Sequence, residues 1–209
     1  MKTKLAIVSL LIIQFSSTAQ LVRTVGVKGG AVAAAQSWDL ASPFSLDTER
    51  RWGIDVGVFV EWLNMPVFSL SSELHYIQKG MKYSLPITTE EFPDGTGEYW
   101  IRSPRVDYLS IPLLGKARIP VEWLSPYVIA GPRVDFLLHT EGEGFEIVLD
   151  KFEKIDLGAT IGVGLEVKVF DPAQLGIEFR FSPSFKDGYS SPYTKVRNSS
   201  LEFLFVAGV

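Results

Sequence analysis

Two histidines, His75 and His139, carry all the imidazole chemistry available in this chain of 209 residues, which contains no cysteine. The absence of cysteine excludes disulfides, thiolate metal sites and cysteine nucleophiles. Glu141 stands two positions after His139, where an esterase site built from His, Ser and Glu would need serine. The spacing therefore supports no catalytic residue, and we expect a non-enzymatic protein.

Acidic side chains gather in two segments, 81–105 and 139–154, and could supply oxygen ligands to Ca²⁺. They are Glu90, Glu91, Asp94 and Glu98 in the first segment and Glu141, Glu143, Glu146 and Asp150 in the second. Neither segment has the spacing of an EF-hand loop. We therefore expect solvated acidic loops, with no metal ligands and no cofactor-binding residues.

The charge balance argues against a nucleic-acid partner, because 20 Lys and Arg face 24 Asp and Glu, for a net charge of −4, and no basic tract occurs. The mean hydropathy is high at +0.18. Even so, no stretch reaches the roughly 18 apolar residues that a membrane helix needs. The chain is hydrophobic enough for a membrane without a helix to place in it.

The first 19 residues have the pattern of a secretory signal peptide. Lys2 and Lys4 precede a short apolar run over residues 5–13, and Ser17 and Ala19 provide small residues before a cleavage point. We therefore expect residues 1–19 to be removed on export and residues 20–209 to form one domain.

Apolar and non-apolar residues alternate with period 2 in eight segments of the remaining chain, which is typical of strands with two different faces. The clearest segments are 155–169, 52–62 and 175–181, and weaker ones lie near 22–34, 67–80, 106–119, 126–138 and 199–208. Short connections (63–66, 120–125, 171–172) alternate with long ones (35–51, 81–105, 139–154, 186–198). The pattern predicts an all-β fold: an eight-stranded antiparallel up-and-down transmembrane β-barrel with short periplasmic turns and long extracellular loops.

The non-apolar face of these segments carries charges of both signs in mid-strand, which is possible inside a narrow barrel if the charges pair. The predicted interior charge network comprises Glu73, His75, Lys116, Arg118, Arg133, Asp135, Glu166, Lys168, Glu178 and Arg180. An eight-stranded barrel has an interior just wide enough for side chains to fill. We expect a plugged lumen.

Aromatic residues cluster at the ends of the segments, as in the two girdles of a membrane barrel. The predicted girdle comprises Trp52, Trp62, Phe68, Trp123, Tyr127, Phe170 and Phe181. Pro112 and Pro132 fall inside two of the segments, where a missing amide donor predicts a bulge or an interrupted ladder.

Four of the segments contain distinctive motifs: YLSIPLLGK at 108–116, PYVIAGP at 126–132, the glycine-rich run at 156–166 and LGIEFRF at 175–181. These motifs resemble those of small outer-membrane β-barrel proteins of the PorT-like and OmpA-like kind, which are common in Bacteroidota. The resemblance covers the mature chain and is sharpest over 106–185. It implies the barrel domain, and the member type that lends its name assists protein secretion across the outer membrane. The last strand ends in Val209 without the terminal aromatic typical of such barrels.

These observations predict an exported, monomeric outer-membrane barrel that acts as a membrane-embedded scaffold or interaction protein. The expected partners are outer-membrane lipid and an envelope or secretion-system protein. Three alternatives stay open: an accessory component of outer-membrane protein secretion, an outer-membrane enzyme acting on lipid, and a soluble lipocalin-like barrel with an apolar lumen. Whether the acidic loops bind Ca²⁺ or lipopolysaccharide is also open.

Overall fold

The computed structural model describes residues 21–40, 48–63, 65–87, 89, 96–121, 123–142, 151–192 and 194–209. The expected signal peptide lies outside these residues. So do six of the eight acidic residues noted in the long segments, all except Glu98 and Glu141.

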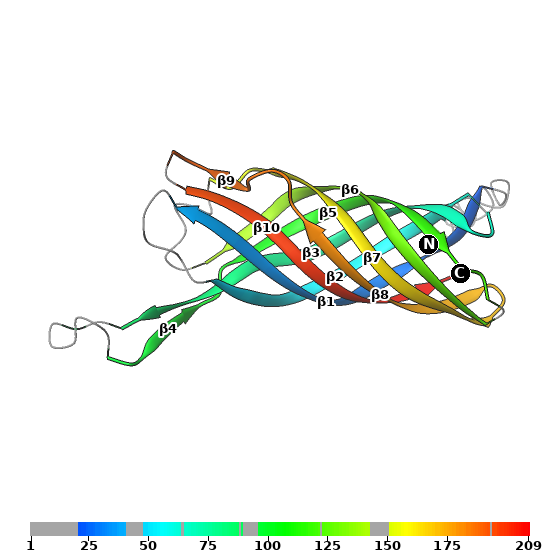
Figure 1. Cartoon of the computed structure of the whole chain (residues 1–209), viewed down its shortest axis with the longest axis horizontal. Coiled ribbons are helices and arrows are strands. Elements are labelled where there is room, and N and C mark those ends of the chain that lie inside the picture. Colours follow the sequence, from blue (N-terminus) through cyan, green and yellow to red (C-terminus); the bar gives the residue numbers. More distant parts are fainter. Residues whose placement is uncertain are drawn as a thin grey trace, which may run out of the picture.

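Eight long strands of the described chain form a closed antiparallel ring (Figure 1). In ring order they are β1 (Val22–Leu40), β2 (Thr48–Trp62), β3 (Phe68–Pro86), β5 (Arg105–Arg118), β6 (Leu124–Glu141), β7 (Ile155–Phe170), β8 (Ala173–Pro183) and β10 (Thr194–Gly208). β4 (Tyr99–Arg102) extends the outer end of β3, and β9 (Tyr189–Ser190) pairs with the start of β10. The predicted eight-stranded up-and-down barrel is confirmed.

The first and last strands close the ring, with register pairs that run from Gly26 and Gly208 to Leu40 and Thr194. Both ends of the described chain lie at the end that carries the short turns, and β4 projects beyond the ring at the opposite end (Figure 1). A closed ring pairs the backbone of every strand on both sides, which removes the open sheet edges that a bilayer does not tolerate. Within the described residues, no helix is long and apolar enough to cross a bilayer.

The strands extend further at the long-loop end than the alternation predicted. Thus His139, which the sequence placed at the start of a loop, lies inside β6 opposite Asp107. Irregularities interrupt the alternation at this end: the register shifts between Asp107 and Tyr108 on β5 and between Arg50 and Asp55 on β2. The strands stay paired on both sides of such bulges, whereas the period-2 alternation of side chains, by which a strand is recognised in the sequence, is interrupted there.

The two prolines interrupt the ladder without shifting it. Between β5 and β6 the bridging pairs pass from Pro112–Arg133 to Gly115–Ala130 in unchanged register. The interrupted ladder expected from the missing amide donors is therefore confirmed, and no bulge accompanies it at this point.

The two faces of the wall have opposite chemistry. Apolar side chains point outward and stay exposed, among them Val58 at 53% and Val163 at 55%, whereas charged side chains point inward and are buried. A soluble barrel would reverse this arrangement, with its charges in water and its apolar face enclosed. The soluble lipocalin-like alternative is therefore wrong.

The lumen is not polar along its whole length. Near the long loops it is filled by an apolar plug, defined by Val32, Ala34, Ile77, Val106, Tyr108, Phe152 and Val196. Phe152 comes from the loop before β7 and stacks on Tyr189, with 6.5 Å between the ring centroids. The interior thus has two parts. Buried charges fill it from the short-turn end to the middle, and apolar side chains fill it next to the long loops.

Candidate functional site

A buried charge cluster occupies the middle of the lumen, built from β1, β3, β8 and their neighbours. Arg180 donates to Glu73 at 2.6 Å and also pairs with Glu178. Lys28 from β1 reaches the same two carboxylates, at 2.7 Å from Glu73 and 3.1 Å from Glu178. All four residues are no more than 6% exposed. Two cations therefore share two carboxylates in a place that water hardly reaches, which is the condition under which buried charge is tolerated.

His75 belongs to the same cluster. Its Nδ1 lies 2.6 Å from an oxygen of Asp55, and its Nε2 lies 2.9 Å from an oxygen of Glu73. Only a protonated imidazole can donate from both nitrogens. The ring therefore acts as a further cation that bridges two carboxylates, and at 2% exposure it is enclosed by the wall.

A second group lies near the short turns. Lys116 pairs with Glu61 at 3.1 Å and with Glu166, and Arg118 pairs with Glu61 and donates to Ser69 at 2.9 Å. These side chains come from β2, β3, β5 and β7. They therefore cross the lumen from opposite walls and fill it at this level.

A third group lies between the central cluster and the apolar plug. Lys79 donates to Asp135 at 2.5 Å, and Arg133 approaches the same carboxylate at 3.1 Å. Arg133 also donates to Ser184 at 3.2 Å, and Ser184 donates to Asp156 at 2.7 Å. The structure thus brings nine of the ten predicted network residues into three stacked interior groups.

Lys168 is the exception. It is exposed, and the prediction that it belongs to the interior network is wrong. The alternation places Lys168 on the same face of β7 as Glu166, and Glu166 is buried as expected. However, Lys168 lies three residues before the tight turn at Asp171 and Pro172, so its side chain extends past the last interior layer.

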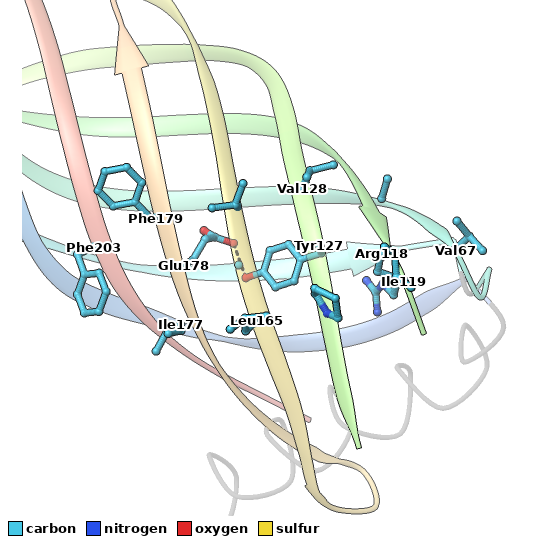
Figure 2. Close-up of a pocket in the computed structure, with 14 residues that line it drawn as sticks. Val67, Arg118, Ile119, Tyr127, Val128, Leu165, Ile177, Glu178, Phe179 and Phe203 are labelled. Carbon is cyan, nitrogen blue, oxygen red and sulfur yellow. Dashed lines mark hydrogen bonds between the residues drawn. The ribbon is translucent and has the colours of Figure 1, made fainter. Parts of the chain in front are cut away.

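Tyr127 is also misplaced by the sequence, which assigned it to the outer girdle. It is 4% exposed and its hydroxyl donates to Glu178 at 2.7 Å inside the barrel (Figure 2). Its ring covers Gly164, where an added Cβ would lie 2.2 Å from the ring carbon Cζ. The glycine on the facing strand therefore provides the space for an aromatic ring in the lumen.

Tyr127→Phe should lower the free energy of unfolding by about 1–3 kcal/mol, because Glu178 would lose a donor in a buried place. Urea unfolding of the barrel in lipid vesicles, followed by tryptophan fluorescence, measures this change. Tyr99→Phe provides the control, since Tyr99 is exposed on β4 and should change stability by less than about 0.5 kcal/mol. Equal effects of the two variants would contradict the interior role of the Tyr127 hydroxyl.

The remaining girdle residues lie on the outer surface, at differing heights. Phe68, Trp123 and Phe170 are exposed beside the short turns, and Trp52 is 71% exposed towards the long loops. Trp62 is half-buried and donates from Nε1 to Ser72 at 2.8 Å.

Phe181, which the sequence assigned to the girdle, lies at mid-wall. It pairs with Ile161 and Leu201, which are central residues of β7 and β10. The reason is that β8 ends at Pro183 and is the shortest of the ring strands.

Several interior residues were not singled out by the sequence: Lys79, Tyr108 and Phe152. The first two could have been found, since Lys79 shares the alternation of Glu73 and His75, and Tyr108 shares that of Lys116. Phe152 carries no such signal, because it belongs to a connection and not to a strand. It is 5% exposed because it packs into the apolar plug from outside the strands.

His139 lies outside the three interior groups. His139 is exposed on β6, and no group of three or more His, Asp and Glu side chains within the described ranges could hold a metal ion. On the outer wall, an apolar groove of about 570 Å³ extends from the short turns to the middle of the wall, over β5 to β10 and past Val128, Phe179 and Phe203 (Figure 2). Such a surface complements lipid acyl chains.

Known proteins are similar to this chain both in sequence family and in fold. The chain matches the family described as outer membrane protein beta-barrel domain over residues 15–189. The crystal structure of the outer membrane protein OprG from Pseudomonas aeruginosa has a TM-score of 0.50 at 8% identity, covering 90% of this chain and 95% of that one. The solution structure of the Escherichia coli Outer Membrane Protein W has a TM-score of 0.47 at 15% identity, covering 91% of this chain and 98% of that one. No curated protein matches the chain.

The likeness to OprG shows the same fold, and the family match covers most of the chain. The exposed apolar wall and the ring of eight strands agree with both, so the protein resides in the outer membrane. This chain belongs to the outer-membrane protein β-barrel domain family.

Proposed function

We propose that the protein is a non-enzymatic, monomeric scaffold of the outer membrane whose long-loop end contacts an envelope protein. The observation that supports this is the filled lumen: three layers of ion pairs and an apolar plug occupy it, leaving the outer surfaces for interaction. Barrels of this type have their longer loops outside the cell and their short turns in the periplasm. The long-loop end, with β4 projecting beyond the wall, is accordingly the larger contact surface.

Site-specific photocrosslinking in intact cells tests this proposal. A photoreactive residue at Tyr99 on β4 or at Phe185, both exposed at the long-loop end, should give a discrete adduct with an envelope protein. The same probe at Ile119, exposed beside a short turn, is the matched position at the other end. Absence of adducts from both long-loop positions would contradict the proposal. Adducts only from Ile119 would favour an accessory role in secretion, carried out from the periplasmic side.

The filled lumen leads to a separate prediction. In planar-bilayer recordings, the purified barrel should show no large, stable conductance, because Arg180, Lys116 and Arg133 with their carboxylates occupy successive levels of the interior. A porin reconstituted in the same way is the positive control. Steady porin-like openings of this protein would refute the filled lumen, whatever the crosslinking result.

A further inference from the structure

Two adjoining hollows in the outer wall form one groove that begins beside the short turns and ends at mid-wall. The first is the apolar hollow of about 570 Å³ shown in Figure 2, and the second, of about 630 Å³, continues it towards the middle of the barrel. Both are lined by Ala117, Val128, Val163 and Phe179. We call the continuous feature the wall groove.

The wall groove exists because small residues lie beside large ones at two successive levels of the wall. At the level nearer the short turns, Ala117 of β5 pairs with Phe68 of β3 on one side and with Val128 of β6 on the other. At the next level, Gly115 pairs with Ala130. A Cβ at Gly115 would lie 3.6 Å from the ring of Phe68. The small residues therefore form the floor of the groove, and the ring of Phe68 forms one side.

Aromatic rings form the opposite side of the wall groove. Val163 of β7 pairs with Phe179 of β8, which in turn pairs with Phe203 of β10. Figure 2 shows both rings together, across the groove from Val67 and Ile119. A hydrocarbon chain that lies on the floor would therefore contact protein on three sides, whereas a chain on a flat wall contacts it on one.

The charged residues that line the wall groove do not turn their charges towards it. Arg118 and Glu178 belong to its lining, but each is no more than 3% exposed. Their charged groups lie in the lumen, where Arg118 pairs with Glu61 and Glu178 accepts a hydrogen bond from Tyr127. The groove therefore suits a hydrocarbon chain and does not select among headgroups.

The length and position of the wall groove match one leaflet of a bilayer. From Leu165 to Ile161 it extends about 13 Å along β7, at about 3.3 Å per residue. Half of the hydrocarbon core of a bilayer is about 15 Å thick. Trp123 and Phe170, exposed beside the short turns, mark the headgroup level, and the short turns of such barrels lie in the periplasm. The groove therefore runs from the headgroups of the periplasmic leaflet to the middle of the membrane.

We propose that the wall groove binds one acyl chain of a glycerophospholipid from the periplasmic leaflet and holds this lipid longer than the rest of the wall holds its lipids. The hydrophobic effect does not select the chain, because the neighbouring lipid tails are equally apolar. Selection comes from shape, since a chain between the two aromatic sides gains van der Waals contacts that a flat wall does not offer. The inference adds a defined lipid site to the barrel and does not depend on the envelope protein proposed above.

Native mass spectrometry of the barrel purified from outer membranes in mild detergent tests the proposal. The wild type should keep one glycerophospholipid at collision energies that remove all other lipid. Ala117→Phe places a ring on the floor of the groove and should lower this retention about tenfold, the effect of losing about ten carbon–carbon contacts. Ala117 is exposed on the outer wall, so the substitution leaves the interior groups in place.

Ile54→Phe is the control, because Ile54 is 49% exposed on the outer face of β2, away from the wall groove. It should retain the lipid as the wild type does. Heat-modifiable migration on gels verifies that each variant has folded. If Ala117→Phe fails this check, Ala130→Phe replaces it, since Ala130 belongs to the same floor. Equal retention by the wild type and the groove variant, or an equal loss with Ile54→Phe, would overturn the proposal.

The chemical nature of the retained lipid provides a second test. Phosphatidylethanolamine and phosphatidylglycerol of equal chain length, added to the same micelles, should be retained within about twofold of each other, because the groove presents no charge to the headgroup. A strong preference for one headgroup would contradict recognition through the chain. Retention of lipid A in place of a glycerophospholipid would assign the groove to the outer leaflet and overturn the proposal.

Discussion

Arg180→Met should destabilise the barrel by about 3–5 kcal/mol, because removing one partner of a buried ion pair leaves an uncompensated charge. Arg180 is 2% exposed and lies between Glu73 and Glu178. Methionine has a similar length, so the main change is the loss of the cation. Lys28 and the His75 ring would then be the cations beside Glu73, Glu178 and Asp55, so the cluster would hold one carboxylate more than it has cations.

Urea unfolding in lipid vesicles, with heat-modifiable migration as a check on assembly, measures this effect. Arg197→Met removes an exposed arginine from the same barrel and should change stability by less than about 0.5 kcal/mol. Adding Glu178→Gln to Arg180→Met removes the surplus carboxylate charge and should recover part of the loss. A single variant as stable as the wild type would mean that the central cluster does not hold the interior together.

The ring itself was accessible from the sequence, because a wall with lipid outside and side chains inside imposes period 2 on every strand. The segment 155–169 alternates throughout, and it became β7 with one further residue. The pairing within the lumen was not accessible. Lys28 meets Glu178 across 150 residues of sequence, and the alternation only states that both face inward.

The errors have physical causes. Tyr127 was assigned to the girdle because of its residue type, although Arg133 and Asp135 on the same strand already placed it inward. Lys168 is on the interior face by the alternation, but it lies too close to a turn to be enclosed. The alternation predicts which face of the wall a side chain is on, and it does not predict how far the residue lies from the end of the barrel. Phe152 reaches the apolar plug from residues 151–154, which precede β7, and period 2 carries no information about residues outside the strands.

The packing at the long-loop end could not be predicted for a related reason. Arg51, Gly80 and Pro104 lie in different parts of the chain, and they come together where β2 carries an irregularity and β3 extends to pair with β4. The residue types of a bulge resemble those of an ordinary loop. The sequence accordingly assigned residues 35–51 and 81–105 to connections.

Val163→Arg should cost about 2–4 kcal/mol of stability in a bilayer, because it places a charge on the lipid face near the membrane midplane. Val163 is 55% exposed on the outer wall and lies in the middle of β7, next to Val128 and Phe179 on the neighbouring strands. The replaced side chain has no interior contact to lose. The whole effect therefore measures contact with lipid.

Val169→Arg is the matched control on the same strand and the same face. Val169 is 53% exposed but lies beside the short turn, where arginine reaches the headgroups and should cost about 0–1 kcal/mol. Unfolding free energies of both variants in vesicles give the comparison. A soluble barrel would accept arginine equally at both exposed positions. A difference of several kcal/mol between two valines six residues apart therefore requires a bilayer around β7, and equal costs at the two positions would contradict the lipid-facing assignment of this wall.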